Sequence, residues 1–200
     1  MGVLVAQQAP NFTTSAVLAN GEIVENYNLH EQIRGKYGVL FFYPLDFTFV
    51  CPSELIALDR RVEEFQKRNA EVISVSIDSH FTHNAWRNTE INDGGIGKVN
   101  YTMAADLDHS ICKAYDVESA GGVAFRGVFV IDDQLNVRSQ IVNDLPIGRN
   151  IDEVIRIVDA IQFNAEHGEV CPAGWNKGDA GMTASTTGVA EYLTNNSSNL

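Results

Sequence analysis

Apolar residues in this chain change their spacing several times, and each change marks a predicted element. Short β-branched or aromatic runs predict strands at about 39–43, 71–77, 101–105, 127–131 and 137–142. Apolar spacings of three and four predict helices at about 51–69, 79–88, 109–115 and 151–167. Two apolar runs on either side of Asn20-Gly21 predict a hairpin. Strands that alternate with helices indicate an α/β fold.

The junction between the 39–43 strand and the following helix carries the main candidate for chemistry, Cys51. This cysteine falls in or just before the first turn of the helix. The first backbone N–H groups of a helix lack partners inside it, and its dipole is positive there, so both favour a thiolate. A cysteine in such a place can have a pKa well below the ordinary value of about 8.5. Glu54 favours the helix start, but it would oppose a thiolate unless a cation neutralises it.

A structural role is the alternative for Cys51, because a single cysteine is often a small buried hydrophobe. The polar Thr48 three residues earlier favours the catalytic interpretation. Thioredoxin-type redox sites have Cys-x-x-Cys at such a turn, and here Thr48 occupies the place of the first cysteine. Any disulfide partner of Cys51 must therefore come from far away.

Composition and charge reduce the range of possible partners, locations and functions. The 200 residues suit one sizeable core, and 44% of them are hydrophobic. A formal net charge of −12 argues against nucleic acid as a partner and gives no attraction to an anionic membrane surface. No run of 18 apolar residues and no signal-peptide pattern is visible, so we expect a cytoplasmic protein with no membrane partner. Three cysteines, an odd number, favour reduced thiols that cycle over a structural disulfide framework.

The segment from Pro44 to Cys51 has the form Pro-x-x-x-Thr-x-x-Cys and resembles the active-site loop of the peroxiredoxins. A later segment, Val170-Cys171-Pro172, resembles the resolving-cysteine motif of the typical two-cysteine subgroup. Other matching segments occur in the same order, namely Trp86, 94–97, Arg126-Gly127 and 144–149. The resemblance covers most of the chain. It implies a thioredoxin-like fold with peroxiredoxin additions, in which helices flank a central mixed sheet.

The resemblance also implies a reaction, the attack of the Cys51 thiolate on a peroxide oxygen to form a sulfenic acid. Cys171 of another chain then condenses with it to a disulfide. For any thiol, a pKa drop from about 8.5 to about 6 raises the thiolate fraction about thirtyfold at pH 7 but weakens the nucleophile about tenfold. Most of the acceleration must therefore come from cations and donors that polarise the O–O bond.

The resemblance assigns supporting roles to five other residues. Arg126 matches the active-site arginine and Thr48 the active-site hydroxyl. Pro44 would shape the pocket and exclude water, and Glu54 would orient an arginine, for which Arg149 is a candidate. On the residues alone, a surface salt bridge is the more common role for Arg126 and Arg149.

Peroxides and thiols are the partners that follow from this reaction. We expect hydrogen peroxide and small organic hydroperoxides as substrates, and thioredoxin or a flavoprotein disulfide reductase as electron donor. We expect at least a homodimer, and rings of five dimers occur in the subgroup. The chemistry needs no cofactor, because electrons pass through thiols.

The histidines give little support to a metal site. His80 and His83 lie on one predicted helix, whose apolar face we expect to be Phe81, Ala85 and Trp86, and no third ligand is indicated. We therefore expect no metal.

Residues 1–168 are expected to form the peroxidase domain, and residues 169–200 a polar tail that carries Cys171. Overoxidation-prone members pair a Gly-Gly-Leu-Gly loop with a Tyr-Phe tail motif, and the corresponding segments here are 94–97 and Tyr192-Leu193. We expect intermediate sensitivity to overoxidation. Cys112 matches no motif and is expected to be packed in the core.

Two other function classes stay open at this point. One is a non-enzymatic role in which the assembly binds unfolded clients or relays oxidation to a partner. The other is thiol–disulfide exchange, against which the absence of Cys-x-x-Cys argues. Turnover of peroxide with a thiol reductant would distinguish the first from a peroxidase.

Overall fold

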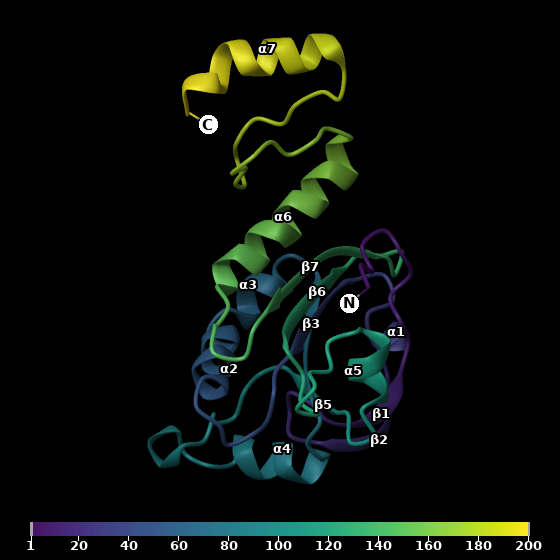
Figure 1. The fold of residues 1–200 in the computed structure, drawn as a ribbon, viewed down its shortest axis with the longest axis vertical. Helices are drawn as coiled ribbons and strands as arrows, with labels where there is room; N and C mark the ends of the chain where they lie inside the picture. The colour runs from purple at the N-terminus through teal and green to yellow at the C-terminus, as the bar shows by residue number, and fades with distance from the viewer. Residues whose placement is uncertain (1, 200) are drawn as a thin grey trace. The chain divides into compact units, whose positions relative to one another are not determined.

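The computed structural model of the chain describes residues 2–199. Within these residues, seven strands form one mixed sheet in the order β2-β1-β5-β4-β3-β6-β7 (Figure 1). The strands are β1 (Thr13–Val17), β2 (Ile23–Asn28), β3 (Tyr37–Phe42), β4 (Ala70–Ser76), β5 (Thr102–Ala105), β6 (Arg126–Ile131) and β7 (Val137–Asn143). Strands β3, β4 and β5 run parallel to one another, and the other adjacent pairs are antiparallel. The prediction of an α/β fold with a central mixed sheet is confirmed.

Five α-helices and a 3-10 turn belong to the described residues up to 151: α1 (Leu29–Gln32), α2 (Cys51–Asp59), α3 (Val62–Gln66), α4 (His80–Arg87), η1 (Ile91–Asp93) and α5 (Ser110–Ala114). The helix predicted at 51–69 is in fact two helices, α2 and α3. Arg61 between them has φ −112° and ψ 0°, which interrupts the regular helix. The predicted apolar stripe is nevertheless buried, since Leu58, Val62 and Phe65 are all at most 5% exposed.

Helices pack on both faces of the sheet. Figure 1 shows α2 and α3 on one side and α1 and α5 on the other. The core on the α1 and α5 side includes Leu29, Ile33, Leu40, Phe42, Ile111, Cys112 and Phe129. Successive residues of a strand point to opposite faces, so Phe41 of β3 points to the α2 side, away from Phe42.

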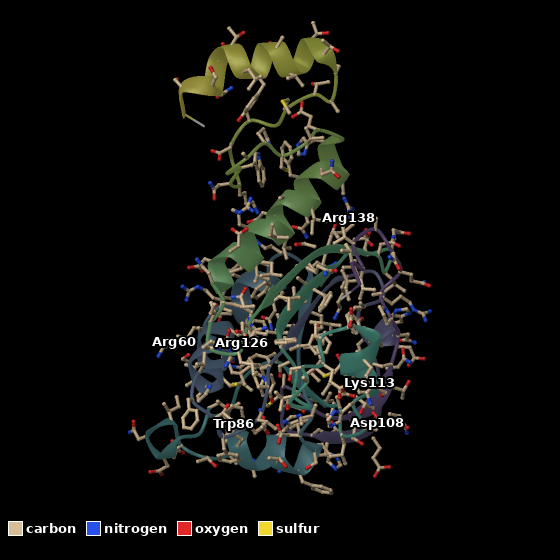
Figure 2. All side chains as sticks on the ribbon, in the orientation of Figure 1. Arg60, Trp86, Asp108, Lys113, Arg126 and Arg138 are labelled. Carbon is tan, nitrogen blue, oxygen red and sulfur yellow. The ribbon has the colours of Figure 1, made fainter. Side chains whose placement is uncertain are left out.

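Strand β3 lies in the middle of the sheet, between β4 and β6, and leads directly to the loop before α2. Both Phe41 and Phe42 are fully buried. Arg126, at the start of β6, is buried as well. Figure 2 shows its side chain near α2. The end of β3, the start of α2 and the start of β6 therefore meet beside the same face of the sheet.

The buried face of α4 differs from the predicted one. Phe81 is 69% exposed and Ala85 is exposed, whereas His83, Trp86 and Arg87 are buried. Ser79 caps the helix and accepts a hydrogen bond from the backbone N–H of Thr82. The two polar side chains are buried because each finds acceptors: His83 faces a carboxylate and a carbonyl, and Arg87 donates to the carbonyls of Ala19 and Val99.

A second compact unit begins at Asp152 and contains most of α6 (Ile151–His167), α7 (Thr186–Asn196) and η2 (Ser197–Asn199). Gly168 ends α6 as predicted, with φ 68°. The segment expected to be a polar tail is ordered. Val170 and Met182 exchange two backbone hydrogen bonds, which closes a loop around Cys171.

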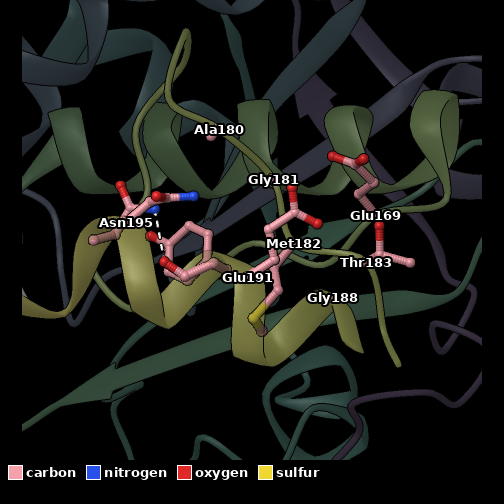
Figure 3. A pocket seen from close by; sticks show the side chains of 10 residues that line it. Glu169, Ala180, Gly181, Met182, Thr183, Gly188, Glu191 and Asn195 are labelled. Carbon is pink, nitrogen blue, oxygen red and sulfur yellow. Dashed lines mark hydrogen bonds between the residues drawn. The ribbon is translucent and has the colours of Figure 1, made fainter. Parts of the chain in front are cut away.

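The loop around Cys171 folds back onto α6. Trp175 is 3% exposed, and its ring centroid lies 4.8 Å from that of Phe163. Arg156 donates to the Trp175 carbonyl at 2.8 Å, and Lys177 pairs with Asp159 at 3.3 Å. Helix α7, which the hydrophobic pattern did not predict, borders a cavity of about 250 Å³ between it and residues 180–183 (Figure 3).

Among the residues that the structure describes, none of the helices has both the length and the apolar character that a membrane span requires. No group of three or more His, Cys, Asp or Glu side chains in this part of the chain is placed to hold a metal ion.

Candidate active site

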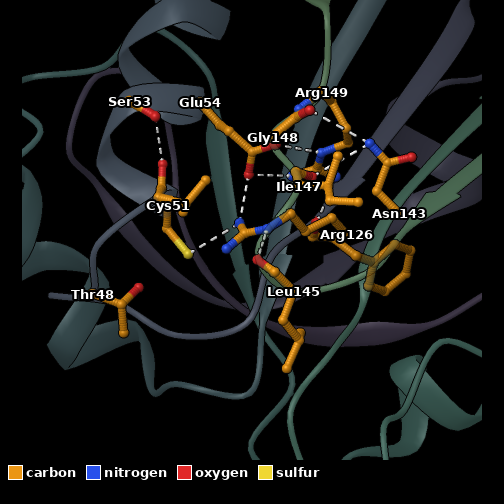
Figure 4. Close-up of polar contacts among 12 residues, drawn as sticks. Thr48, Cys51, Ser53, Glu54, Arg126, Asn143, Leu145, Ile147, Gly148 and Arg149 are labelled. Atoms are coloured by element: carbon orange, nitrogen blue, oxygen red, sulfur yellow. Dashed lines mark hydrogen bonds and ion pairs between the residues drawn. The ribbon is translucent and has the colours of Figure 1, made fainter.

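Cys51 is the first residue of α2, and its side chain is 0% exposed. Its Sγ lies 3.5 Å from Nη1 of Arg126, which donates a hydrogen bond to it (Figure 4). Pro52 occupies an early helical position, where its missing N–H needs no acceptor. The sulfur therefore lies at the positive end of a helix dipole, as the position of Cys51 in the sequence predicted, and the guanidinium of Arg126 lies beside it.

Glu54 joins the two arginines of the site. Its Oε2 accepts hydrogen bonds from Nη1 of Arg126 at 2.7 Å and from Nη2 of Arg149 at 3.0 Å. Its Oε1 accepts from the backbone N–H and the Nε of Arg149, both at 2.8 Å. Glu54 lies one helical turn after Cys51, so α2 places the carboxylate and the sulfur on the same side.

Burial raises the pKa of the Glu54 carboxyl, but the hydrogen bonds and charge of Arg149, together with the charge of Arg126, outweigh it and hold the pKa below its ordinary value. Burial lowers the pKa of the Arg149 guanidinium, and its bonds to Glu54 oppose this. Since a guanidinium keeps its proton well above neutral pH, the site holds one carboxylate and two cations. The excess positive charge lies next to the sulfur.

The arginines are fixed by backbone carbonyls as well as by Glu54. Nε of Arg126 donates to the carbonyl of Leu145 at 2.5 Å. Nη1 of Arg149 donates to the carbonyls of Phe42 and Gly127 at 2.6 and 2.7 Å. The Arg149 guanidinium also lies 3.4 Å from the ring centroid of Phe41.

The side chains of Arg126 and Arg149 are 4% and 2% exposed. The surface salt bridge that residue types alone favoured for each arginine is therefore wrong.

The loop before α2 brings Pro44 and Thr48 to the site. Pro44 is buried, and Thr48 is half-buried with its hydroxyl donating to the carbonyl of Leu45 at 2.8 Å. Because its proton is used there, Thr48 Oγ1 presents lone pairs that can accept a hydrogen bond. Phe47, directly before it, has φ 54°, a left-handed conformation that is uncommon for a bulky residue.

A buried sulfur at a helix start, with a guanidinium from β6 beside it and an acceptor hydroxyl on the preceding loop, is typical of a thiol-based site. The profile of the AhpC/TSA family matches residues 5–140, and that of the C-terminal domain of 1-Cys peroxiredoxin matches residues 160–195. The chain belongs to the AhpC/TSA family of peroxiredoxins. The thioredoxin-like fold expected from the sequence motifs is the fold of this family and is confirmed.

Individual peroxiredoxins match over nearly the whole chain. Alkyl hydroperoxide reductase C of Helicobacter pylori is 52% identical over 195 residues, which are 98% of this chain and 98% of that protein. The thioredoxin peroxidase of Trypanosoma brucei rhodesiense is 49% identical over 92% of each chain. The reduced 2-Cys peroxiredoxin of Plasmodium vivax superposes with a TM-score of 0.93 at 45% identity, covering 96% of this chain and 100% of that one.

Cys171 lies in the second unit of this peroxiredoxin. It is half-buried, and its Sγ donates to the carbonyl of Ala160 at 3.5 Å. Burial raises the pKa of this thiol, and the charge of Arg156 opposes the shift. Cys171 therefore lies on a loop that packs on α6 within the second unit.

Cys112 is a core residue, as predicted. It is 0% exposed and belongs to the cluster on the α5 side of the sheet. Burial, and then the hydrogen bond and charge of Asp106, raise the pKa of its thiol far above the ordinary value. We therefore expect this thiol to react slowly in the folded chain.

The sequence motifs brought together Cys51, Glu54, Arg126 and Arg149, with Pro44 and Thr48 in the adjoining loop. They did not indicate what holds that loop in place. Asp46, Asp78 and His83 are buried or half-buried polar residues around the loop and interact with it. Helical spacing could have pointed to His83, which lies three residues before the buried Trp86.

Proposed function

We propose that the chain is a thiol-dependent peroxidase whose nucleophile is Cys51. The Cys51 thiolate attacks one oxygen of a hydroperoxide, the O–O bond breaks, and the other oxygen leaves as an alkoxide or hydroxide that takes up a proton. Cys51 becomes a sulfenic acid. The observation that carries this proposal is the buried Sγ at a helix start, 3.5 Å from the Arg126 guanidinium.

Arg126 and Thr48 act on the peroxide. Nη1 of Arg126 already contacts Sγ, so the guanidinium is placed to stabilise the negative charge that moves from sulfur to the leaving oxygen. The Thr48 hydroxyl, with its proton directed at Leu45, accepts a hydrogen bond from the O–H of the peroxide. Glu54 and Arg149 keep Arg126 in its orientation. Pro44 forms part of the pocket wall and excludes water.

Resolution uses the second cysteine. The Cys171 thiol of a partner subunit attacks the Cys51 sulfenic acid, which gives an intersubunit disulfide and water. A dithiol reductant, either thioredoxin or a flavoprotein disulfide reductase, then reduces this disulfide and returns both thiols. The relatives named alkyl hydroperoxide reductase C and thioredoxin peroxidase support this cycle.

Hydrogen peroxide and small organic hydroperoxides are the proposed substrates, and a homodimer is the smallest unit that completes the cycle. A ring of five dimers is the proposed assembly, and native mass spectrometry of the reduced protein tests it. A cytoplasmic location stays a prediction that cell fractionation would check.

The experiment for this function is a non-reducing denaturing gel after one equivalent of hydrogen peroxide. The chains compared are the parent, Cys51→Ser and Cys171→Ser, all with Cys112→Ala, so that the parent keeps Cys51 and Cys171 and each variant keeps one of them. A disulfide-linked dimer is expected in the parent and in neither cysteine variant. Peroxide should be consumed by the parent and by Cys171→Ser for one turnover, and not by Cys51→Ser.

Two outcomes would contradict the proposal. Monomer bands in all three chains, with Cys171 still open to alkylation, would remove Cys171 from the mechanism. Equal consumption of peroxide by the Cys51→Ser variant would remove Cys51.

A further inference from the structure

A buried polar cluster lies beneath the loop that precedes Cys51. It consists of Tyr43, Asp46 and His83, which are 0%, 7% and 0% exposed. The Tyr43 hydroxyl donates to Oδ1 of Asp46 at 2.6 Å, and Nδ1 of His83 lies 2.8 Å from Oδ2. Nε2 of His83 lies 3.3 Å from the carbonyl of Ala104 in β5. None of these three side chains reaches the sulfur, so the reaction proposed above does not use them directly.

The ring of His83 is held at both of its nitrogens. A carbonyl can only accept, so Nε2 carries a hydrogen that it donates to Ala104. Asp46 accepts from Tyr43 on one carboxyl oxygen, and burial and the charge of Asp46 raise the pKa of the Tyr43 hydroxyl, which keeps it a donor. The other carboxyl oxygen shares a hydrogen bond with Nδ1 of His83. His83 and Asp46 therefore link α4 to the loop through a buried hydrogen bond.

Asp46 is also held through its backbone. Its N–H donates to Oδ2 of Asp78 at 2.8 Å, and the same oxygen accepts from the Ser76 hydroxyl at 2.8 Å. The backbone of Asp46 therefore contacts the segment that follows β4, and its side chain contacts His83 of α4, which in turn contacts β5. Asp46 is thus held by both its main chain and its side chain.

Phe47, the residue after Asp46, has a strained backbone conformation. Phe47 has φ 54°, and its ring is 51% exposed, with its centroid 5.6 Å from that of the buried Trp86. A bulky side chain stays in a left-handed conformation where its surroundings enforce it. After Phe47 come Thr48 and, three residues on, Cys51. The contacts that hold Asp46 therefore determine where the Thr48 hydroxyl and the Cys51 sulfur lie.

We propose that Asp46 and His83 are positioning residues for peroxide reduction, because their buried hydrogen bond holds the left-handed turn at Phe47 and with it Thr48 and Cys51. This inference rests on the proposed function, since it concerns the reaction of Cys51 with peroxide. The sequence motif contains Asp46 but does not indicate its partner, which α4 supplies from 37 residues away.

The test compares two reactions of the same sulfur in Asp46→Asn. Reduction of hydrogen peroxide needs the aligned hydroxyl and guanidinium, whereas alkylation by iodoacetamide needs only an accessible thiolate. We expect the rate of sulfenic acid formation, followed by stopped-flow kinetics and dimedone trapping, to fall about tenfold or more. We expect the alkylation rate to fall much less, or to rise as the loop loosens.

Asp132→Asn is the matched control. Asp132 is 6% exposed, pairs with Arg138 and accepts the N–H groups of Gln134 and Asn136 in the β6–β7 turn. This substitution also removes a buried carboxylate, but away from the loop, so we expect the peroxide rate to stay within about threefold of the parent. An equal loss in both variants would overturn the proposal, because it would reflect general destabilisation.

A second pair of variants applies if Asp46→Asn does not fold. His83→Asn keeps an amide where Nδ1 hydrogen-bonds with Asp46, and His83→Leu removes it. We expect His83→Asn to keep more of the peroxide rate than His83→Leu, with similar alkylation rates in both. Equal peroxide rates in the two variants would overturn the proposal.

The parent chain separates the two hypotheses. If the parent forms no sulfenic acid, the proposed function fails and the positioning role with it. If the parent reacts and Asp46→Asn reacts as fast, the positioning role alone fails.

Discussion

At the residue scale, the active site depends on one carboxylate between two guanidiniums. Glu54 is 3% exposed and contacts both Arg126 and Arg149. A buried ion pair is expensive to break, because the remaining charges are left without a counterion in a medium of low polarity. Glu54 therefore matters for stability as well as for the orientation of Arg126.

The Glu54→Gln variant tests how much the Glu54 carboxylate stabilises the fold, because this contribution should depend on pH. The pKa of the Glu54 carboxyl is lower in the folded chain than its ordinary value of 4.5. The stabilisation it gives is therefore fully present above about pH 4.5 and is lost as the pH falls through the lower, folded-state pKa. We expect the free energy of unfolding of the parent to fall on acidification more steeply than that of Glu54→Gln, and to exceed it by about 3 kcal/mol at pH 7.

Urea titrations from pH 7 to pH 3 measure both quantities for the two chains. Glu153→Gln is the control, because Glu153 pairs with Arg156 on an exposed part of α6 and should cost under about 1 kcal/mol. Parallel pH curves for the parent and Glu54→Gln would contradict the argument.

Cys112 gives a second prediction at this scale. Burial and the neighbouring Asp106 raise the pKa of its thiol, and its side chain is 0% exposed. In the reduced native protein at pH 8, we expect iodoacetamide to modify Cys112 at least about a hundredfold more slowly than the half-buried Cys171. Peptide mass spectrometry after timed alkylation gives both rates. In urea the two rates should become similar, and rapid labelling of Cys112 without urea would contradict this.

At the element scale, local pattern predicted the turn from β3 into α2 because all its determinants are adjacent in sequence. An aromatic run, a proline and a new apolar spacing place Cys51 at a helix start. The partners of the site come from elsewhere: Leu145 and Gly127 supply carbonyls to the arginines, and their roles depend on sheet topology. Without the family motifs, neither buried arginine would have been assigned to the site.

Helix α4 shows why periodicity alone was insufficient. The apolar Phe81 is exposed and the polar His83 is buried, because Asp46 and Ala104 satisfy the histidine. A hydrophobicity pattern cannot include the partner that makes burial of a polar group favourable. Helix α7 escaped prediction for a related reason, since none of its described residues is fully buried and its apolar stripe is weak.

The loop that holds Cys171 leads to a third prediction. Trp175 is 3% exposed and packs on Phe163, so it holds the loop against α6. Trp175→Ala leaves a cavity there, and we expect the loop to detach part of the time. Formation of the Cys51–Cys171 disulfide should then slow about three- to tenfold while sulfenic acid formation stays unchanged.

Quenched-flow gels and dimedone trapping measure the two steps separately. Trp175→Phe keeps a ring against Phe163 and should retain most of the disulfide rate. An unchanged disulfide rate in Trp175→Ala would mean that the packing does not position Cys171.

At the scale of the whole molecule, the two cysteines of the proposed cycle lie in different compact units, with Cys51 in the unit before residue 152 and Cys171 in the one after it. In the proposed cycle, the resolving thiol therefore comes from the second unit of a partner chain. The division of roles at residue 168 stays a prediction, because α6 and the Cys171 loop pack on each other within the second unit.

Helix α7 leads to the fourth prediction. Tyr192 lines the cavity between α7 and residues 180–183, which belong to the loop that holds Cys171. In overoxidation-prone peroxiredoxins, the tail and the Gly-Gly-Leu-Gly loop together hold the helix of the reactive cysteine folded and so delay disulfide formation. Removal of α7 by truncation before Gly188 should accordingly speed resolution and leave less time for a second peroxide to convert Cys51 to sulfinic acid.

Mass spectrometry of Cys51 after a series of peroxide doses, with a thiol reductant present, measures the sulfinic acid directly. We expect the truncated chain to need a severalfold higher dose than the parent for half conversion, about threefold or more. Truncation after Asn196 keeps α7 and should behave as the parent. Equal conversion of the parent and the chain cut before Gly188 would show that α7 does not control the competition between resolution and overoxidation.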